Sequence, residues 1–273
     1  MRHLFKVILS VLFIFNSLKN DAQIYGDQAF ETTPTWSDEF NYTGYPNENI
    51  WIITETSQKE HDAVYVKNKR NCFVKRGKLN LTLRKVNKGD TIYESGRIYA
   101  NTNHHIKYGK LQMKAKCSTV KGAWEALWLR SVGNAANGVR GEIDFMEYIG
   151  DWGKDKFQIN FHLRGDFSGK RKNHKQYPKF PVIDISKWHI YTIEWYPDRI
   201  KVYVDKTLYY DFKKGDIPEW PFENPYQLIM AFGYNPNWSK TKEKDDSSLP
   251  QTLKVDYVRY YKYKEDYITC IQN

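Results

Sequence analysis

The segment GEIDFMEYIG contains three carboxylate side chains, Glu142, Asp144 and Glu147, in a span of six residues. In a β-strand, residues two apart point to the same face, so Glu142 and Asp144 would share a face and Glu147 would point the other way. A β-bulge around Phe145–Met146 would shift this alternation by one residue and return Glu147 to the face of the other two acids. We therefore predict that all three acids line one surface, with Ile143 and one member of the Phe145–Met146 pair facing the core.

Such a row of acids suits glycosidic bond cleavage. A retaining glycosidase uses two carboxyl groups about 5–5.5 Å apart, one to attack the anomeric carbon and one to protonate the leaving oxygen. A middle acid that shares a proton with a neighbour would separate their pKa values, which leaves an anionic nucleophile and a protonated acid at neutral pH. The spacing alone leaves two other interpretations open: three acids on a solvated strand face, or a calcium-binding cluster.

The elements that position these acids are expected to be β-strands. Short segments of alternating or β-branched and aromatic residues recur along the chain, separated by turn residues, and convincing amphipathic helices are absent. The pattern predicts an all-β fold, a sandwich of two antiparallel sheets. The Pro-rich segment 215–226 and the polar segment 239–250 are predicted to be loops. The predicted strands are 79–86, 110–117, 157–163, 189–196, 199–205 and 253–263.

The first 22 residues are typical of a secretory signal peptide. Arg2 and Lys6 flank the start of the apolar stretch VILSVLFIF, a polar segment follows, and Ala22 lies near a plausible cleavage site. The apolar stretch is too short to span a bilayer comfortably, although an uncleaved anchor is the alternative. We therefore predict an exported protein, secreted or periplasmic and without stable membrane insertion, in which residues 23–273 form a single domain.

The net charge indicates which classes of partner suit the protein, and the cysteine count bears on disulfides. The chain carries a formal charge of +10 at pH 7, and residues 1–22 account for little of it. A basic exported protein suits an anionic polymer or is simply soluble, and no Lys/Arg motif for nucleic acid is evident.

The odd number of cysteines leaves at least one thiol free, and incidental thiols are favoured over a single disulfide. The cysteines are Cys72, Cys117 and Cys270.

The acidic segment resembles the signature of glycoside hydrolase family 16, Glu-x-Asp-x-x-Glu in its bulged form. Five further segments, in the same order along the chain, resemble conserved parts of that family, so the likeness spans roughly residues 35–263. They are WSDEF (36–40), SGRI (95–98) with YGKLQMKAK (108–116), GAWEALWL (122–129), IEWYPDRIKVYVD (193–205) and VDYVRYYKY (255–263). The resemblance implies a β-jelly-roll sandwich with a long concave cleft and a retaining endo-hydrolase of β-linked polysaccharides, in the laminarinase and endo-β-galactosidase-like branch.

The resemblance also implies roles for individual residues. Glu142 would be the nucleophile, Glu147 the general acid/base and Asp144 the assisting acid. His162 would hydrogen-bond Asp144 or the sugar, and Arg97 would reach a sugar hydroxyl unless it forms a salt bridge. Because aromatic rings stack on sugar C–H faces, we expect four tryptophans at the cleft, whereas Trp195 is expected to pack inside. The four are Trp124, Trp128, Trp152 and Trp238.

Catalysis is expected to need no cofactor, but the resemblance implies one structural Ca²⁺ on the convex side. Its ligands would be Glu39, the carbonyl of Gly77, and Asp256, all oxygen donors that suit calcium. Glu39 and Asp256 could instead pair with basic neighbours.

The sequence departs from laminarinase relatives at the cleft rim, which affects the predicted substrate. An aromatic Trp-Pro pair usual before the Gly-Glu is missing from SVGNAANGVRGE, Glu125 replaces a proline, and the segment 163–177 is basic. Loss of a bulky ring could admit the axial hydroxyl of galactose, and a basic rim suits anionic chains. We lean slightly towards a β-galactoside polymer, such as a mucin-type or keratan-type glycan or an algal galactan, over an endo-β-1,3(4)-glucan.

Two other functions share this scaffold. A non-catalytic carbohydrate-binding relative would keep the aromatic cleft but often lose an acid, and here all three acids are present. A transglycosylase would form the same glycosyl-enzyme intermediate and differ only in the acceptor. We expect the protein to be a monomer.

Overall fold

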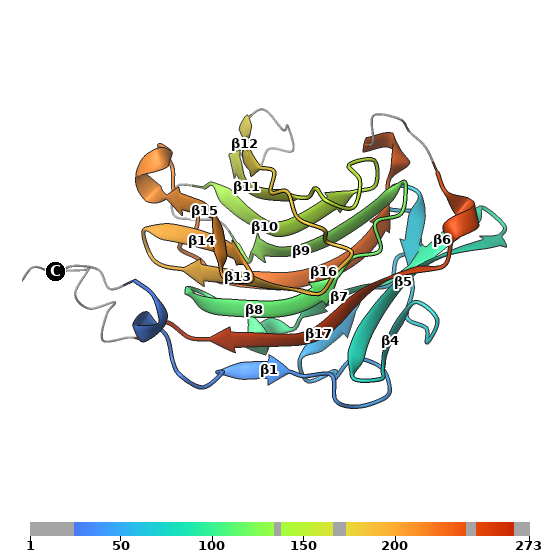
Figure 1. Cartoon of the computed structure of the whole chain (residues 1–273), viewed down its shortest axis with the longest axis horizontal. Coiled ribbons are helices and arrows are strands. Elements are labelled where there is room, and N and C mark those ends of the chain that lie inside the picture. The colour runs from blue at the N-terminus through green and yellow to red at the C-terminus, as the bar shows by residue number, and fades with distance from the viewer. Residues whose placement is uncertain (1–24, 134–137, 166–172, 239–243, 265–273) are drawn as a thin grey trace, which may run out of the picture.

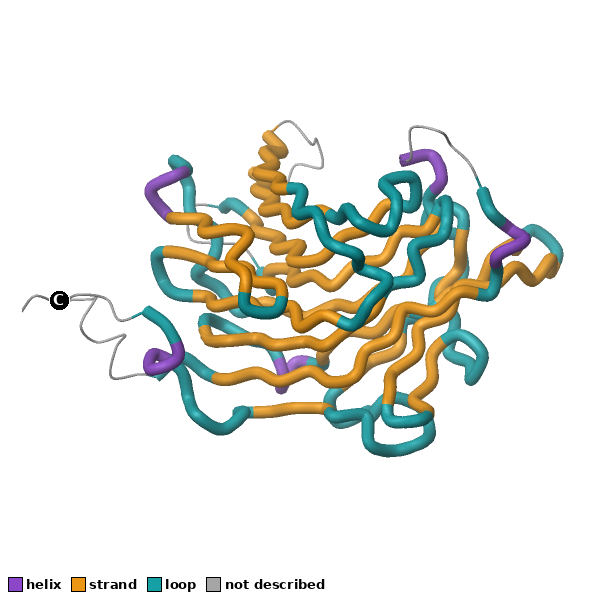
Figure 2. Tube along the Cα trace, viewed as in Figure 1, coloured by secondary structure: helices purple, strands orange, loops and turns teal. Residues whose placement is uncertain are grey.

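The computed structural model describes residues 25–133, 138–165, 173–238 and 244–264. Two twisted sheets lie one above the other, and the strands of both follow a long curve (Figure 1). Short 3₁₀ turns interrupt the loops, and strands dominate the trace (Figure 2). These turns are η1 (Asp27–Ala29), η2 (Thr102–His104), η3 (Lys214–Asp216), η4 (Pro236–Trp238) and η5 (Asp246–Ser248). The predicted signal peptide, residues 1–22, lies outside the described residues.

The ten-stranded sheet has the order β15-β14-β13-β8-β17-β5-β6-β3, and β1 and β4 pair with β17 and β5. Its strands are β1 (Trp36–Asp38), β3 (Ala63–Tyr65), β4 (Cys72–Lys75), β5 (Lys78–Lys88), β6 (Thr91–Ser95), β8 (Gly109–Lys116), β13 (His189–Trp195), β14 (Arg199–Val204), β15 (Thr207–Lys213) and β17 (Gln251–Tyr261). The pairs are antiparallel except β3 with β6, which run in parallel.

The seven-stranded sheet has the order β12-β11-β10-β9-β16-β7-β2, with every pair antiparallel. Its strands are β2 (Trp51–Ile53), β7 (Arg97–Ala100), β9 (Ala123–Ser131), β10 (Arg140–Ile149), β11 (Gln158–Gly165), β12 (Asn173–Lys179) and β16 (Tyr226–Tyr234). The acidic segment forms β10, between β9 and β11.

The predicted all-β sandwich is confirmed, and each predicted strand is present within two residues of its expected bounds. The Pro-rich segment 215–226 is a loop that leads from η3 into β16, as predicted. β12 was not predicted, because its sequence NHKQYPK offers neither alternation nor β-branched residues and its pairing with β11 is what extends it.

The space between the sheets is filled by apolar side chains from both. Along β9, Leu127 and Leu129 are fully buried there, while the alternating residues Trp124 and Trp128 point to the outer face. Trp195 is buried, as predicted. Cys72 and Cys117 are buried free thiols, and Cys270 lies outside the described residues. Within the described part of the chain, no helix has the length and apolar character needed to cross a bilayer.

Gly141, directly before the first acid of β10, fills a position where no side chain fits. A Cβ atom there would lie 1.9 Å from the hydroxyl oxygen of Tyr226 and 2.9 Å from the ring of Phe222. Both rings are fully buried, so neither can move aside at low cost.

We predict that Gly141→Ala lowers the free energy of unfolding by about 1–3 kcal/mol, as overpacking of a buried site does. Urea titration followed by tryptophan fluorescence measures the change. Gly215→Ala is the matched control, because open space surrounds Gly215 and its backbone is not left-handed. Equal stability of the two variants would show that this face of β10 tolerates a side chain.

Candidate active site

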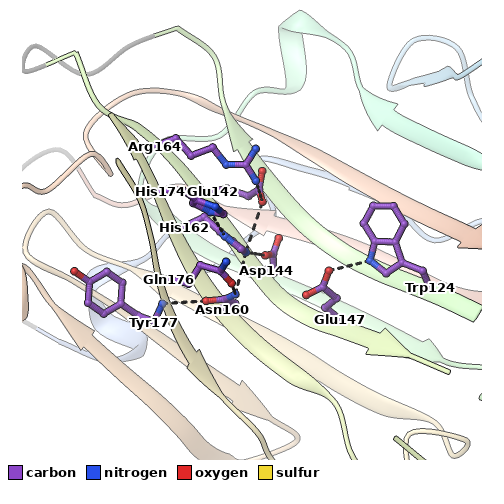
Figure 3. A network of polar contacts seen from close by, with 10 residues as sticks. All are labelled: Trp124, Glu142, Asp144, Glu147, Asn160, His162, Arg164, His174, Gln176 and Tyr177. Atoms are coloured by element: carbon purple, nitrogen blue, oxygen red, sulfur yellow. Dashed lines mark hydrogen bonds and ion pairs between the residues drawn. The ribbon is translucent and has the colours of Figure 1, made fainter. Parts of the chain in front are cut away.

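A β-bulge interrupts β10 between Asp144 and Glu147. Asp144 pairs with Asn160 of β11 and Glu147 pairs with Gln158, so two residues of β10 oppose one residue of β11. The register against β9 shifts at the same place. The bulge brings all three carboxylates to one face, where they line the same cleft (Figure 3). This prediction is confirmed.

One detail of the predicted bulge was wrong. Phe145 and Met146 are both fully buried, whereas only one of them was expected to face the core. The two residues of a bulge share the space opposite one partner residue, and here the core accommodates both side chains.

The cleft lies on the outer face of the seven-stranded sheet and has a volume of about 960 Å³. Its lining changes in character along β10. Trp124 lies opposite Ile149 at one end, and Arg130 lies opposite Glu142 towards the other. The acids therefore stand between an aromatic end and a cationic end. The polar and aromatic lining residues include His61, Trp124, Trp128, Arg130, Arg140, Gln158, Asn160, His162, Arg164, His174, Gln176 and Trp238.

His162 of β11 contacts two of the acids. Its Nε2 lies 2.7 Å from Asp144 Oδ2 and 3.7 Å from Glu142 Oε1. Burial, and next the charge of Glu142, raise the pKa of Asp144 well above its usual value, while burial lowers the pKa of His162. The contact predicted between His162 and Asp144 is confirmed.

A second layer of polar groups orients His162. Its Nδ1 lies 2.7 Å from Nε2 of His174 on β12, and the two imidazole rings stack. Asn160 Nδ2 lies 3.0 Å from His162 Nε2, and its Oδ1 accepts from the backbone N–H of Tyr177 (Figure 3). With both imidazoles neutral, the amide N–H of Asn160 donates to His162 Nε2, so His162 carries its proton on Nδ1 and donates it to His174 Nε2. Asp144, whose pKa is raised, is then the donor in its contact with His162 Nε2.

Glu142 and Glu147 occupy different electrostatic surroundings. Arg164 Nη2 lies 2.9 Å from Glu142 Oε1, and this ion pair stabilises the carboxylate anion. Glu147 is partly buried, and desolvation, followed by the charge of Asp144, raises its pKa to about 8. Glu147 is therefore mostly protonated at neutral pH, whereas Glu142 lies beside a guanidinium, and this is the division of labour that acid-assisted displacement requires.

The cluster of Glu142, Asp144 and His162 does not fit the calcium alternative. Its potential ligand atoms lie within 4.8 Å of one another, but Ca²⁺ takes six to eight oxygen ligands, and an imidazole supplies none. Glu142 is also already paired with Arg164.

Three of the four tryptophans predicted at the cleft lie there: Trp124, Trp128 and Trp238. Trp124 sits over Gly233 of β16, where a Cβ would come within 2.8 Å of its ring, and packs edge-on against Trp238. Trp152 was placed wrongly. The turn after β10 carries it past the cleft, where it packs against Phe180 and the core.

Arg97 does not line the cleft, so its predicted contact with a sugar is not supported. Its Nη1 and Nη2 lie 2.6 and 2.8 Å from the two carboxylate oxygens of Glu60, and its guanidinium stacks on the ring of Tyr65. The salt bridge left open in the sequence analysis is the contact that forms. It holds the loop that ends at Asp62 and carries His61 to the cleft.

The carboxylates predicted to bind calcium both contact cations. Glu39 forms a two-pronged ion pair with Arg259, and Asp256 pairs with Lys78 and Lys114. Gly77 forms the turn between β4 and β5 with a left-handed φ of 69°. These contacts favour the alternative of pairing with basic neighbours, and calcium binding stays a prediction.

Sequence reasoning missed several residues that complete the site. Asn160 and Arg164 stand two positions either side of His162, so strand alternation from that residue would have found both. His61 gave no such signal, because it reaches the cleft through a loop in a left-handed conformation with φ 62°. The cleft residues of β12 could not be found without recognising that strand.

The raised pKa of Glu147 gives a pH-dependent prediction. Activity that needs the protonated acid should fall as pH rises through about 8. The indole N–H of Trp124 donates to Glu147 Oε1 at 2.8 Å, which favours the charged form, so Trp124→Phe should move the alkaline limb of the kcat/KM profile to higher pH. Trp128→Phe, which removes no such bond, is the control. A limb that stays in place, or moves to lower pH, contradicts this role.

Comparison with known proteins agrees with this geometry. The model of the Glycosyl hydrolases family 16 matches residues 58–259. A beta-glucanase from Rhodothermus marinus is 29% identical over 94% of each chain, and a keratan-sulfate endo-1,4-beta-galactosidase from Sphingobacterium multivorum is 27% identical over 83% of this chain and 54% of that protein. The solved laminarinase from Rhodothermus marinus is 27% identical, with a TM-score of 0.74 over 86% of this chain and 99% of that one. The chain belongs to glycosyl hydrolase family 16 and is a glycoside hydrolase.

Proposed function

We propose that this enzyme is a secreted, retaining endo-β-glycosidase that hydrolyses internal β-1,3 or β-1,4 linkages of a polysaccharide or long glycan. The observation that carries the proposal is the bulge in β10, which sets an ion-paired Glu142 and a partly buried Glu147 of raised pKa on one face of the cleft.

The reaction follows from the two environments. Glu142 attacks the anomeric carbon, and its carboxylate oxygen forms the glycosyl ester as the bond to the leaving oxygen breaks. Glu147 gives its proton to that oxygen and becomes the carboxylate. It then takes a proton from water, whose oxygen displaces Glu142 and restores both acids. The His162–Asp144 contact holds the middle carboxyl group beside the nucleophile throughout.

For the substrate, we propose a β-galactoside polymer, with an endo-β-1,3(4)-glucan as the alternative. The galactoside is supported by the keratan-sulfate relative and by the cleft wall before β10, where Ser131 and Gly133 stand in the lining. The glucan is supported by the Rhodothermus marinus beta-glucanase. Residues 134–137, and residues 166–172 of the basic segment, lie outside the described residues.

Two further features of the proposal rest on the sequence. The apolar segment near the N-terminus supports export through a cleaved signal peptide. A monomer is the simplest state for an enzyme whose described residues complete the acid cluster within one chain.

We predict that Glu142→Gln lowers kcat/KM by about 10⁴-fold or more, because the amide cannot form the ester intermediate. The substrate is found first by incubating wild type with laminarin, lichenan, agarose, carrageenan, keratan sulfate and mucin glycans and reading product masses. Proton NMR of the first product then reports the anomeric configuration, which should be retained.

Glu219→Gln is the matched control for that substitution, because Glu219 is exposed on a loop and lines no part of the cleft. Inverted product would rule out the double displacement. Polymer retention in affinity gels without any cleavage would instead favour a carbohydrate-binding relative.

A further inference from the structure

Three arginines gather at the end of the cleft beside Glu142. They come from three adjacent strands: Arg130 from β9, Arg140 from β10 and Arg164 from β11, and all three line the cleft. Arg130 lies directly opposite Glu142, while Arg140 lies directly opposite Arg164. All three side chains are exposed, so a bound molecule can reach them.

Cross-strand pairing collects cationic side chains at this end of the cleft. Arg140 and Arg164 form a directly opposed pair, and Arg164 also contacts Glu142 through Nη2. An oxygen anion that enters this end of the cleft therefore comes close to guanidinium groups from three neighbouring strands.

Neighbouring groups hold two of these guanidiniums in place. Arg130 Nη2 donates to Gln227 Oε1 at 3.1 Å, and its guanidinium lies 5.9 Å from the ring centroid of Trp128. Arg164 is fixed by its contact with Glu142. Guanidinium groups held in this way are pre-organised for oxygen anions, because their planar set of N–H donors matches carboxylate and similar groups.

The opposite end of the cleft is different. There the lining consists of Trp124, Trp238, His61 and Ile149, and the rings of the first three pack edge to face. Burial lowers the pKa of His61, so this end carries little charge at neutral pH. The cleft therefore has an aromatic end, formed by the rings of Trp124, Trp238 and His61, and a cationic end, formed by the three arginines. The arginines concentrate positive potential beside Glu142.

We propose that Arg130, Arg140 and Arg164 form a subsite for an anionic substituent, a sulfate ester or a carboxylate, on a sugar unit bound beside Glu142. This inference rests on the proposed function, since it describes the substrate of the same cleft. It assigns to the enzyme a charged glycan in preference to a neutral one.

The test measures binding apart from hydrolysis. Affinity electrophoresis is run in the Glu147→Gln background, so that the polymer is not cut, in gels containing κ-carrageenan or keratan sulfate for sulfate esters, alginate for carboxylates, and agarose or laminarin as neutral polymers. We expect at least one anionic polymer to retard the protein more than either neutral polymer does. Adding Arg130→Gln with Arg140→Gln should weaken that retardation at least about tenfold, because two charge-assisted contacts are lost.

The matched control removes the same charge elsewhere. The control variant combines Lys116→Gln with Lys254→Gln. These two lysines lie on the outer face of the ten-stranded sheet, where they are cross-strand partners. This pair should change the retardation less than about twofold. The inference is overturned if no anionic polymer is preferred over the neutral ones, or if the arginine and lysine pairs weaken binding equally. Failure of the proposed function would instead appear as absence of cleavage by the wild type on the whole panel, whatever the gels show.

Discussion

The bulge in β10 is the constraint on which the active site depends. A regular strand would place Glu147 on the side of Phe145 and Ile143, inside an apolar core that cannot accept a carboxylate. The inserted residue instead sends Phe145 and Met146 into that core and brings Glu147 to the cleft. Burial of those two side chains stabilises the irregular register, because a return to regular pairing would expose one of them to solvent.

The two outer acids of this strand lie in different electrostatic surroundings. Glu142 forms an ion pair with the guanidinium of Arg164, which favours the carboxylate anion. Glu147 is partly buried, and desolvation raises its pKa to about 8. Asp144, between them, is buried and contacts a neutral imidazole. Three negative charges at such short range would repel strongly, and proton uptake by the buried members is what allows the cluster to persist.

Strand periodicity predicted most of the fold and the core of the site, because both depend on local alternation. The acids and the bulge follow from spacing within β10, whereas His162 and the cleft tryptophans Trp124 and Trp128 follow from the resemblance to the family. The errors have a common cause, which is position relative to distant elements. Trp152 was misplaced because the sequence of a turn does not determine the direction in which the chain leaves it. Arg97 was misplaced because its partner Glu60 lies 37 positions away in the sequence. The grouping of Arg130, Arg140 and Arg164 was likewise not predicted, since only the register of three strands brings these residues together.

Arg97 nevertheless supports the reacting groups from a distance. Its ion pair with Glu60 anchors the residue directly before His61, and the imidazole of His61 lies 5.2 Å from the ring of Trp124. Trp124 in turn donates its indole N–H to Glu147. The direction of that donor affects the pKa of the acid, so its position must be fixed, and a ring packed on one side by Gly233 and at its edge by His61 has little freedom to turn. The salt bridge outside the cleft is thus connected to Glu147 through His61 and Trp124, and of these contacts the indole hydrogen bond is the one that acts on the pKa of Glu147.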